Sequence, residues 1–203
     1  LETLGADGFC ATFDNARRIR ARAVVVATGV QYRRLPIEGL AGFEGAGVYY
    51  AATDIEARYS KGTEAIIIGG GNSAGQAAMF LSRTASRVRL LVRGFSLAAS
   101  MSSYLSSRLE ADPAITIEYG AEVSALHGGS DHLESVTIRH AANGSEETVA
   151  TRALFIMVGA APNTGWLSDL VRLDDKGFVL TGATVGASSP FAASLPGIFA
   201  VGD

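Results

Sequence analysis

One glycine-rich turn, with an apolar run before it and a helical pattern after it, constrains the fold of this chain more than any other feature. Residues 65–68 read AIII, a wholly apolar run that is typical of a parallel strand covered on both faces. The run leads directly into residues 69–74, GGGNSA, which have the spacing G-x-G-x-x-A. Four apolar residues then recur with the period of an amphipathic helix: Ala74, Ala77, Ala78 and Leu81. The sequence therefore predicts a strand, a tight turn and a helix in immediate succession.

The residues of this turn are suited to holding the pyrophosphate of a dinucleotide. Gly69 can make the tight turn, Gly71 lets the backbone approach a phosphate, and the small Ala74 lets the helix pack closely on the strand. We expect Asn72 or Ser73 to cap the helix, whose free N–H groups would face the phosphates. The alternative is a structural turn in an ordinary α/β fold, but the strand before it and the helix after it favour a dinucleotide site.

The end of the next strand indicates which dinucleotide is bound. Residues 87–92 read RVRLLV and predict a second strand, which is followed by Arg93 and Gly94. In sites specific for NAD an Asp or Glu at this place holds the ribose 2′-hydroxyl, whereas a guanidinium suits a 2′-phosphate. Because the chain has Arg93 and no carboxylate here, it favours NADPH over NADH. The alternative is that Arg93 is a solvated surface cation.

Composition excludes several other classes of protein. The 203 residues are 48% apolar, which is enough for a sizeable core. The 17 basic and 20 acidic residues give a net charge of -3 without a long run of either sign, so we expect no nucleic acid partner. The apolar runs are too short to span a bilayer and the start lacks a signal peptide, which predicts no membrane partner and a cytoplasmic location. The single cysteine, Cys10, cannot form an intrachain disulfide and is interpreted as a small, partly buried hydrophobe.

The remaining patterns extend the strand, turn and helix into an α/β fold. A hairpin over residues 9–23 precedes an apolar strand at 24–26, and a helix over 102–111 precedes a parallel strand at 115–119. Short alternating runs between residues 121 and 151, separated by glycine turns, predict an antiparallel meander, and a buried strand follows at 153–158. We expect a Rossmann-like parallel sheet with helices and an attached β-meander.

The sequence suggests neither a metal site nor a hydrolytic centre. His127, His132 and His140 lie in or beside the meander without Cys partners or a shared helix face, and we interpret them as exposed loop histidines. There is also no set of serine, histidine and acid with an elbow-like turn. We therefore expect no metal ion and no catalytic acid, base or nucleophile in this segment.

Four motifs taken together resemble those of the FAD-dependent pyridine nucleotide-disulfide oxidoreductases, most closely the proteins similar to thioredoxin reductase. They are VATG at 26–29, the turn at 69–74, GAAPNT at 159–164 and GIFAVGD at 197–203. In that family two separate segments of the sequence form the FAD domain, and the NADPH domain is inserted between them. The resemblance therefore implies FAD-domain segments at residues 1–46 and 165–203 and an NADPH domain at 47–164, with NADPH and FAD as cofactors.

The resemblance also assigns residues to the two cofactors. Those at the NADPH pyrophosphate would be Gly69, Gly71, Asn72, Ser73 and Ala74. Arg93 would hold the 2′-phosphate and Gly159 would form the floor of the pocket, while the FAD side of the full-length protein would include Thr28, Gly29, Gly202 and Asp203. The family's first glycine cradle would precede Leu1. We therefore expect a longer, homodimeric protein with an unknown electron acceptor, in which this segment alone is inactive.

Two departures from the family pattern bear on the acceptor. The redox-active Cys-x-x-Cys of the family precedes the NADPH cradle, and anchoring it on Ala52 and Thr53 puts Ala51 and Asp54 in the cysteine positions. A dithiol relay cannot form there. The arginine-rich stretch of the family is reduced to Arg93. The chain is thus also similar to ferredoxin- or flavodoxin-coupled NADP reductases, and a dinucleotide-sensing domain without turnover is the alternative from another class.

Overall fold

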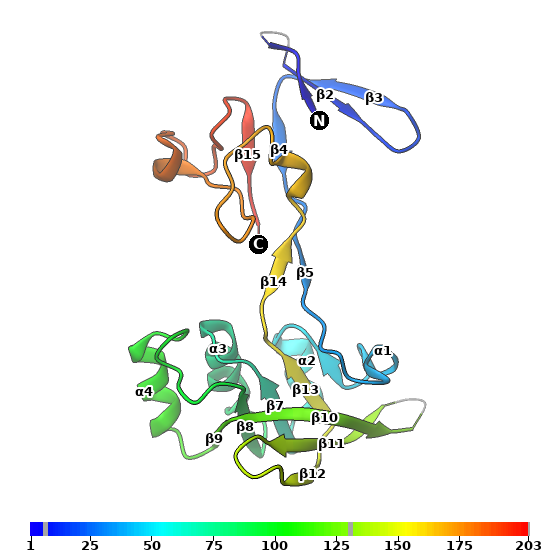
Figure 1. The fold of residues 1–203 in the computed structure, drawn as a ribbon, viewed down its shortest axis with the longest axis vertical. Helices are drawn as coiled ribbons and strands as arrows, with labels where there is room; N and C mark the ends of the chain where they lie inside the picture. Colours follow the sequence, from blue (N-terminus) through cyan, green and yellow to red (C-terminus); the bar gives the residue numbers. More distant parts are fainter. Residues whose placement is uncertain (6–7, 130–131, 203) are drawn as a thin grey trace. The chain divides into compact units, whose positions relative to one another are not determined.

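The chain forms two compact units. The computed structural model describes residues 1–5, 8–129 and 132–202 (Figure 1). Unit 1 consists of two segments, residues 1–33 and 160–203, and unit 2 is the continuous stretch 34–159 that lies between them in the sequence.

Unit 2 is built on a parallel sheet of five strands. Their order across the sheet is β6-β13-β7-β8-β9, and every neighbouring pair is parallel. The strands are β6 (Val48–Tyr49), β13 (Ala153–Ile156), β7 (Glu64–Ile68), β8 (Arg87–Val92) and β9 (Ile115–Tyr119). Because the strands are parallel, their carboxyl ends lie along one edge of the sheet, where ligands bind in folds of this kind.

Successive residues of β7 enter two different cores. Ala65 and Ile67 pack with helices α2 (Asp54–Tyr59), α3 (Asn72–Leu81) and α4 (Ser103–Ala111). Ile66 and Ile68 pack on the opposite side of the sheet. All four side chains are buried, which explains why the run is wholly apolar and does not alternate with polar residues.

An antiparallel meander and a short helix supply the second core. Three strands form the meander: β10 (Ala121–Gly128), β11 (Leu133–His140) and β12 (Glu146–Ala150). Apolar residues of all three strands pack against β7 and β13 on the face of the sheet opposite to α3. Leu40 from helix α1 (Leu40–Phe43) joins the same core. Unit 2 therefore has three layers, with α2, α3 and α4 on one face of the parallel sheet and the meander with α1 on the other (Figure 1).

Unit 1 combines small sheets around its own core. Strands β1 (Glu2–Thr3), β2 (Phe9–Thr12) and β3 (Arg18–Ala21) form an antiparallel sheet. Two strand pairs follow, β4 (Val24–Val26) with β15 (Ile198–Ala200), and β5 (Val30–Tyr32) with β14 (Ala160–Pro162). The 3-10 helices η2 (Gly165–Leu167) and η3 (Gly182–Val185) complete the unit. The buried residues of its hydrophobic cluster are Phe9, Val26, Leu167, Val171, Ala193 and Ile198.

The α/β fold class, the strands on either side of the turn and the meander are as predicted from the sequence. The boundary between the units differs, because it falls at residues 33/34 and 159/160 and not at 46/47 and 164/165. Leu35, Ile37 and Phe43 pack against the meander core, which places the connector 34–46 in unit 2. Helix α2 was not predicted. Within the described ranges, none of the helices is long and apolar enough to cross a membrane.

Candidate dinucleotide-binding site

The turn after β7 requires glycine at its first position. Gly69 has a φ of 150°, and an added Cβ there would lie 2.4 Å from the carbonyl oxygen of Met157 and 2.9 Å from the Cβ of Ala74. Met157 is held in place because its N–H donates to the carbonyl oxygen of Ile68 at 2.8 Å. A side chain at position 69 would thus collide with the end of β13 and with α3. The predicted tight turn and the close approach of Ala74 are both present.

Helix α3 begins with an open N-terminus. Its N-cap is Gly71, with extended backbone and no side-chain cap, so the expectation that Asn72 or Ser73 caps the helix was wrong. A Cβ added to Gly71 would meet only the carbonyl oxygen of Ser100, at 3.8 Å. The N–H groups of the first turn therefore lack a side-chain acceptor, and the space beside Gly71 is free for a ligand. Such an arrangement suits an anion such as a pyrophosphate.

Asn72 connects the glycine turn to the segment before α4 by a hydrogen bond. Asn72 is the first residue of α3, one position after the N-cap, and its Oδ1 accepts a hydrogen bond of 2.9 Å from the N–H of Ser102. The Ser100 hydroxyl donates to the carbonyl oxygen of Gly70 at 2.7 Å. These two bonds tie residues 100–102, the segment before α4, to the glycine turn. No local pattern predicts these two bonds, because the partners lie 30 residues apart in the chain.

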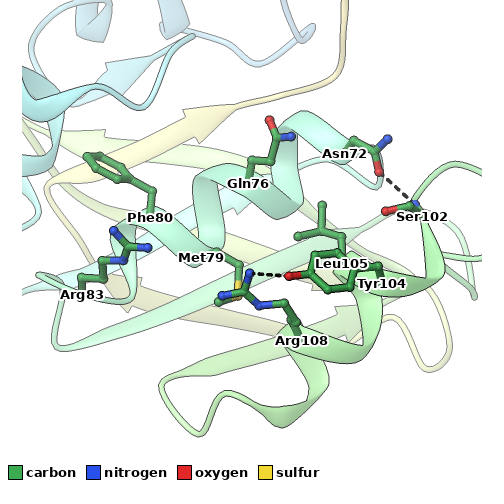
Figure 2. A pocket seen from close by; sticks show the side chains of 9 residues that line it. All are labelled: Asn72, Gln76, Met79, Phe80, Arg83, Ser102, Tyr104, Leu105 and Arg108. Atoms are coloured by element: carbon green, nitrogen blue, oxygen red, sulfur yellow. Dashed lines mark hydrogen bonds between the residues drawn. The ribbon is translucent and has the colours of Figure 1, made fainter.

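A groove runs between α3 and α4 beside this turn (Figure 2). It has a volume of about 340 Å³ and reaches the turn at Asn72 and Ser102. Met79, Phe80 and Leu105 supply apolar side chains to it. Figure 2 shows the hydrogen bond of 3.2 Å that Arg108 Nη1 donates to the Tyr104 hydroxyl. The guanidinium carbon also lies 5.6 Å from the centroid of the Tyr104 ring, so the Arg108 charge already has an aromatic partner.

Arg93, the residue predicted to hold a 2′-phosphate, comes directly after strand β8. It follows Val92, the last residue of β8, at the carboxyl edge of the sheet, and its side chain is exposed. Among the residues that the structure describes, Arg93 has no ion pair. Other arginines of unit 2 are paired, such as Arg89 with Glu147 and Arg34 with Glu44. The Arg93 guanidinium is therefore available to an anion from solvent.

The motifs of unit 1 come together in a smaller cavity of about 130 Å³. Thr28, Gly29 and Gly202 line it, together with residues of β14, β15 and the segment 178–181. Asn163 joins two of the motifs, because its Nδ2 donates to the Thr28 carbonyl oxygen at 3.0 Å and its N–H donates to the Gly29 carbonyl oxygen at 3.1 Å. Sequence reasoning assigned no role to Asn163. Asp203 lies outside the described residues.

Gly159 is not part of either cavity. It is the last residue of unit 2, it is exposed with a φ of 92°, and a Cβ there would meet no atom within 4 Å. The neighbouring Met157, not Gly159, contacts the glycine turn. The assignment of Gly159 to a pocket floor stays a prediction that rests on the family resemblance.

The segment that would carry a dithiol is the start of helix α2. Thr53 is the N-cap and Asp54 the first residue of the helix, and Thr53 and Glu56 form a capping box. The Thr53 N–H donates to Glu56 Oε2 at 3.0 Å, and the hydrogen bond from the Thr53 hydroxyl lowers the pKa of the Glu56 carboxyl. The one cysteine of the chain, Cys10, is buried in β2 of unit 1, where Arg18 Nε donates to its Sγ at 3.3 Å. Ala51 and Asp54 offer no sulfur.

The described residues contain no group of three or more His, Cys, Asp or Glu side chains that could hold a metal ion. His127 Nε2 is hydrogen-bonded at 2.7 Å to the Thr137 hydroxyl within the meander, and His132 lies 3.7 Å from Glu134. His140 Nε2 lies 3.8 Å from a Glu118 oxygen and is only partly exposed, so it is not the exposed loop histidine that we expected.

A parallel sheet whose glycine turn lies between a strand's carboxyl end and an uncapped helix N-terminus defines the class of dinucleotide-binding α/β proteins. The comparisons with known proteins narrow this class. The sequence model of the family described as pyridine nucleotide-disulphide oxidoreductase matches residues 4–203. The chain therefore belongs to this family of flavoprotein oxidoreductases, and within it the chain is similar to thioredoxin reductases.

Two curated relatives and one solved structure illustrate the similarity. A thioredoxin reductase of Streptomyces clavuligerus is 35% identical over 184 residues, which are 91% of this chain and 54% of that protein. A thioredoxin reductase of Listeria monocytogenes is 30% identical over 93% of this chain and 56% of its own length. The crystal structure of thioredoxin reductase from Streptococcus pyogenes matches with a TM-score of 0.82 at 29% identity, covering 100% of this chain and 62% of that chain. The chain thus spans little more than half the length of these curated relatives.

Proposed function

We propose that unit 2 binds NADPH and presents it for hydride transfer to FAD in a full-length oxidoreductase similar to thioredoxin reductase. In this proposal the NADPH domain is the predicted stretch 47–164, adjusted to the limits of unit 2, and unit 1 belongs to the FAD domain. The nicotinamide supplies the hydride and the flavin accepts it, so the protein contributes binding and orientation. No acid or base from this chain is needed for that step.

The observation that carries the proposal is the open space beside Gly71 at the uncapped start of α3. Backbone N–H groups of the first helical turn can donate to the pyrophosphate there, and the positive end of the helix dipole favours its charge. The residues that would line the pyrophosphate are Gly69, Gly71, Asn72, Ser73 and Ala74. Asn72 would act through its bond to Ser102, by holding the neighbouring loop in place.

Arg93 would select NADPH over NADH. Its exposed guanidinium follows β8 at the sheet edge and can make charge-assisted hydrogen bonds to a 2′-phosphate. The ribose hydroxyl of NADH offers no charge to pair with. The preference then depends on a single arginine, because the residues that follow it, Gly94 and Phe95, are uncharged.

The cavity of unit 1 would lie against FAD in the full-length protein. Thr28, Gly29 and Gly202 already share one cavity, and the resemblance adds Asp203 to them. The fit is to a part of the flavin cofactor only, because 130 Å³ is smaller than a whole cofactor site. The alternative of a dinucleotide sensor without turnover would leave these residues without a flavin to contact.

The electron acceptor would be reached without a dithiol from this chain. Where the family resemblance places the cysteines, this chain has the start of helix α2, with a capping box formed by Thr53 and Glu56. The one cysteine, Cys10, is buried in the other unit. A flavin that passes electrons directly to a partner, as in the NADP reductases coupled to ferredoxin or flavodoxin, is consistent with this arrangement. The thioredoxin reductases among the relatives carry that name for a different acceptor.

Calorimetric titration of the 203-residue chain with NADPH and NADH tests the proposal. We expect the original chain to bind NADPH more tightly than NADH. In the Arg93→Ala variant the ratio of the two affinities should fall by roughly tenfold, since a charge-assisted hydrogen bond is worth about 1.5–3 kcal/mol. Arg87→Ala is the matched control, because Arg87 is an exposed arginine at the opposite end of the same strand. Equal affinities for the two cofactors, or an Arg93→Ala variant that behaves like Arg87→Ala, would refute the role of Arg93.

A further inference from the structure

The ring of Phe95 is held on the surface beside the predicted 2′-phosphate site. Its side chain is 77% exposed, although large aromatic side chains normally bury most of their area. Phe95 comes two residues after Arg93 and follows β8 at the carboxyl edge of the parallel sheet. Its exposure therefore falls at the edge where dinucleotides bind in this fold class, at the end that carries the adenosine ribose.

The ring of Phe95 packs against Gly120. A Cβ added to Gly120 would lie 2.9 Å from Cε1 of Phe95, 3.6 Å from its Cζ and 3.7 Å from its Cδ1. The ring thus lies against the backbone of Gly120, in space that a side chain would fill. Gly120 also has a φ of 63°, a conformation that favours glycine on its own account.

The backbone on both sides of this contact is fixed as well. Val92 and Tyr119 are paired at the ends of β8 and β9, and the Gly120 N–H donates to the carbonyl oxygen of Gly94 at 3.1 Å. The Gly120 carbonyl oxygen in turn accepts from the N–H of Ala141 at 2.8 Å. The backbone beside Phe95 is therefore joined by hydrogen bonds to the ends of β8, β9 and β11.

An exposed aromatic ring that packs edge-on against the backbone and leaves its faces to solvent is suited to stack against another flat ring. Adenine offers such a face, and stacking of a base on an aromatic side chain does not depend on hydrogen-bonding groups. A phosphate held by Arg93 would bring the adenosine half of the dinucleotide to this edge of the sheet. The chemistry of the site then combines one cation and one aromatic surface.

We infer that Phe95 is a binding residue of the dinucleotide site and supplies the stacking surface for the adenine ring of NADPH. This inference rests on the proposed function of unit 2 and adds a residue to it. The single arginine at position 93 and the stacking ring at position 95 together hold the adenosine end of the cofactor. Gly120 is a positioning residue, because it leaves room for the ring.

The test uses the 203-residue chain with NADPH and adenosine 2′,5′-bisphosphate as probes. Phe95→Leu should weaken the binding of both probes by roughly tenfold, whereas Phe95→Trp should bind them about as well as the original chain. Phe13→Leu is the matched control, because Phe13 is also an exposed phenylalanine, 50% accessible, in unit 1. Phe95 is exposed, so neither substitution should lower the melting temperature.

A spectroscopic measurement separates stacking from a general loss of affinity. In the background Trp166→Phe, which removes the only natural tryptophan, Phe95→Trp should report binding of adenosine 2′,5′-bisphosphate by a loss of indole fluorescence. If the original chain binds NADPH but Phe95→Leu binds it equally well and the new tryptophan does not respond, the role of Phe95 is overturned and the proposed function stands. If the original chain fails to bind NADPH, both are overturned.

Discussion

The carbonyl oxygen of Met157 closes over Gly69 so tightly that an added Cβ at position 69 would lie 2.4 Å from it. The residue that follows β13 therefore packs directly against the turn that follows β7. Two residues further along, Gly71 faces open space, with the Ser100 carbonyl oxygen 3.8 Å from an added Cβ. The first glycine of the G-x-G-x-x-A turn is therefore required by packing, whereas the second leaves open space beside the start of α3.

Alanine substitutions should separate these two roles. Gly69→Ala should lower the free energy of unfolding by more than about 2 kcal/mol, because the clash is with backbone and the φ of 150° disfavours a side chain. Gly71→Ala should cost less than about 1 kcal/mol, the usual difference between glycine and alanine at an N-cap, but weaken NADPH binding by roughly tenfold or more. Urea unfolding and calorimetry measure the two quantities.

Gly42→Ala is the control for this pair, because Gly42 lies in α1 and a Cβ there would meet no atom within 4 Å. It should leave both stability and affinity close to those of the original chain. A Gly71→Ala variant with unchanged NADPH affinity would contradict the assignment of the pyrophosphate to this turn.

The helix and strands around this turn could be predicted because their signals are local. The apolar run at 65–68 and the spacing of Ala74, Ala77, Ala78 and Leu81 directly reflect burial on the sheet and in the helical layer. The cap of α3 could not be predicted in the same way. Asn72 is an ordinary capping residue, but the fold uses its Oδ1 for Ser102, 30 residues away.

Two other features show where sequence reasoning reaches its limit. Helix α2 has only six residues, too few to show a period, although Thr53 and Glu56 have the spacing of a capping box and could have indicated its start. The contact of Phe95 with Gly120 depends on the pairing of β8 with β9, and nothing in either segment alone indicates it. The strand, turn and helix of the candidate site were thus predictable from the sequence, and so was the place of Arg93 after β8, but the packing of Phe95 on Gly120 was not.

Among the charged residues of unit 2, we expect substitution of Arg89 to lower the free energy of unfolding most. Its side chain is only 13% exposed and it binds carboxylates from three strands, Glu64 of β7, Glu118 of β9 and Glu147 of β12. Burial alone would lower the pKa of the guanidinium, but the hydrogen bonds that Arg89 donates to Glu147 and Glu118 outweigh burial and raise this pKa. Arg89 thereby joins the parallel sheet to the meander, and it remains charged at every accessible pH.

Arg89→Met should lower the free energy of unfolding by about 3–5 kcal/mol, because it leaves the carboxylate of Glu118 buried without its partner. Adding Glu118→Gln should restore part of this loss, since the neutral amide needs no counter-charge. Urea denaturation of the single and double variants measures both effects. A loss below about 1 kcal/mol in Arg89→Met would show that water screens the cluster in spite of its burial.

Glu147 should contribute a small, pH-dependent part of the stability. The hydrogen bond from Arg89 lowers the pKa of its carboxyl below the usual value. A carboxyl whose pKa is lower in the folded state stabilises the fold above its unfolded pKa of about 4.3, and this stabilisation is lost as the pH falls through the folded pKa. Glu147→Gln should therefore flatten the dependence of stability on pH in the range of roughly 5 to 3.

The size of this effect should be modest and should fall with added salt, because the side chain of Glu147 is 53% exposed. Glu110→Gln is the control, since Glu110 is an exposed carboxylate of α4 that has no ion pair among the residues described. Melting temperatures recorded between pH 3 and pH 7 give the comparison. Identical pH profiles for the Glu147→Gln and Glu110→Gln variants would contradict the prediction.

The last prediction concerns the electron acceptor. The full-length protein should move electrons from NADPH to flavin and on to an artificial one-electron acceptor, but it should not reduce thioredoxin through this segment. Transfer to thioredoxin by thiol exchange needs a thiolate at each step. The positions that the family resemblance assigns to these cysteines are Ala51 and Asp54, which have no sulfur, and Thr53 and Glu56 form a capping box at the same place, the start of α2.

Cys10 cannot replace this pair. It is 2% exposed in β2 of unit 1, it is the only cysteine of the chain, and a single thiol cannot form the intramolecular disulfide that the relay requires. NADPH-dependent reduction of thioredoxin, measured beside reduction of ferricyanide, gives the test, with Cys10→Ser as the matched variant. Ferricyanide turnover should be the same in both proteins, and thioredoxin should stay oxidised. Efficient reduction of thioredoxin that survives Cys10→Ser would instead place a dithiol elsewhere in the full-length protein and overturn the proposal of a direct flavin-to-partner route.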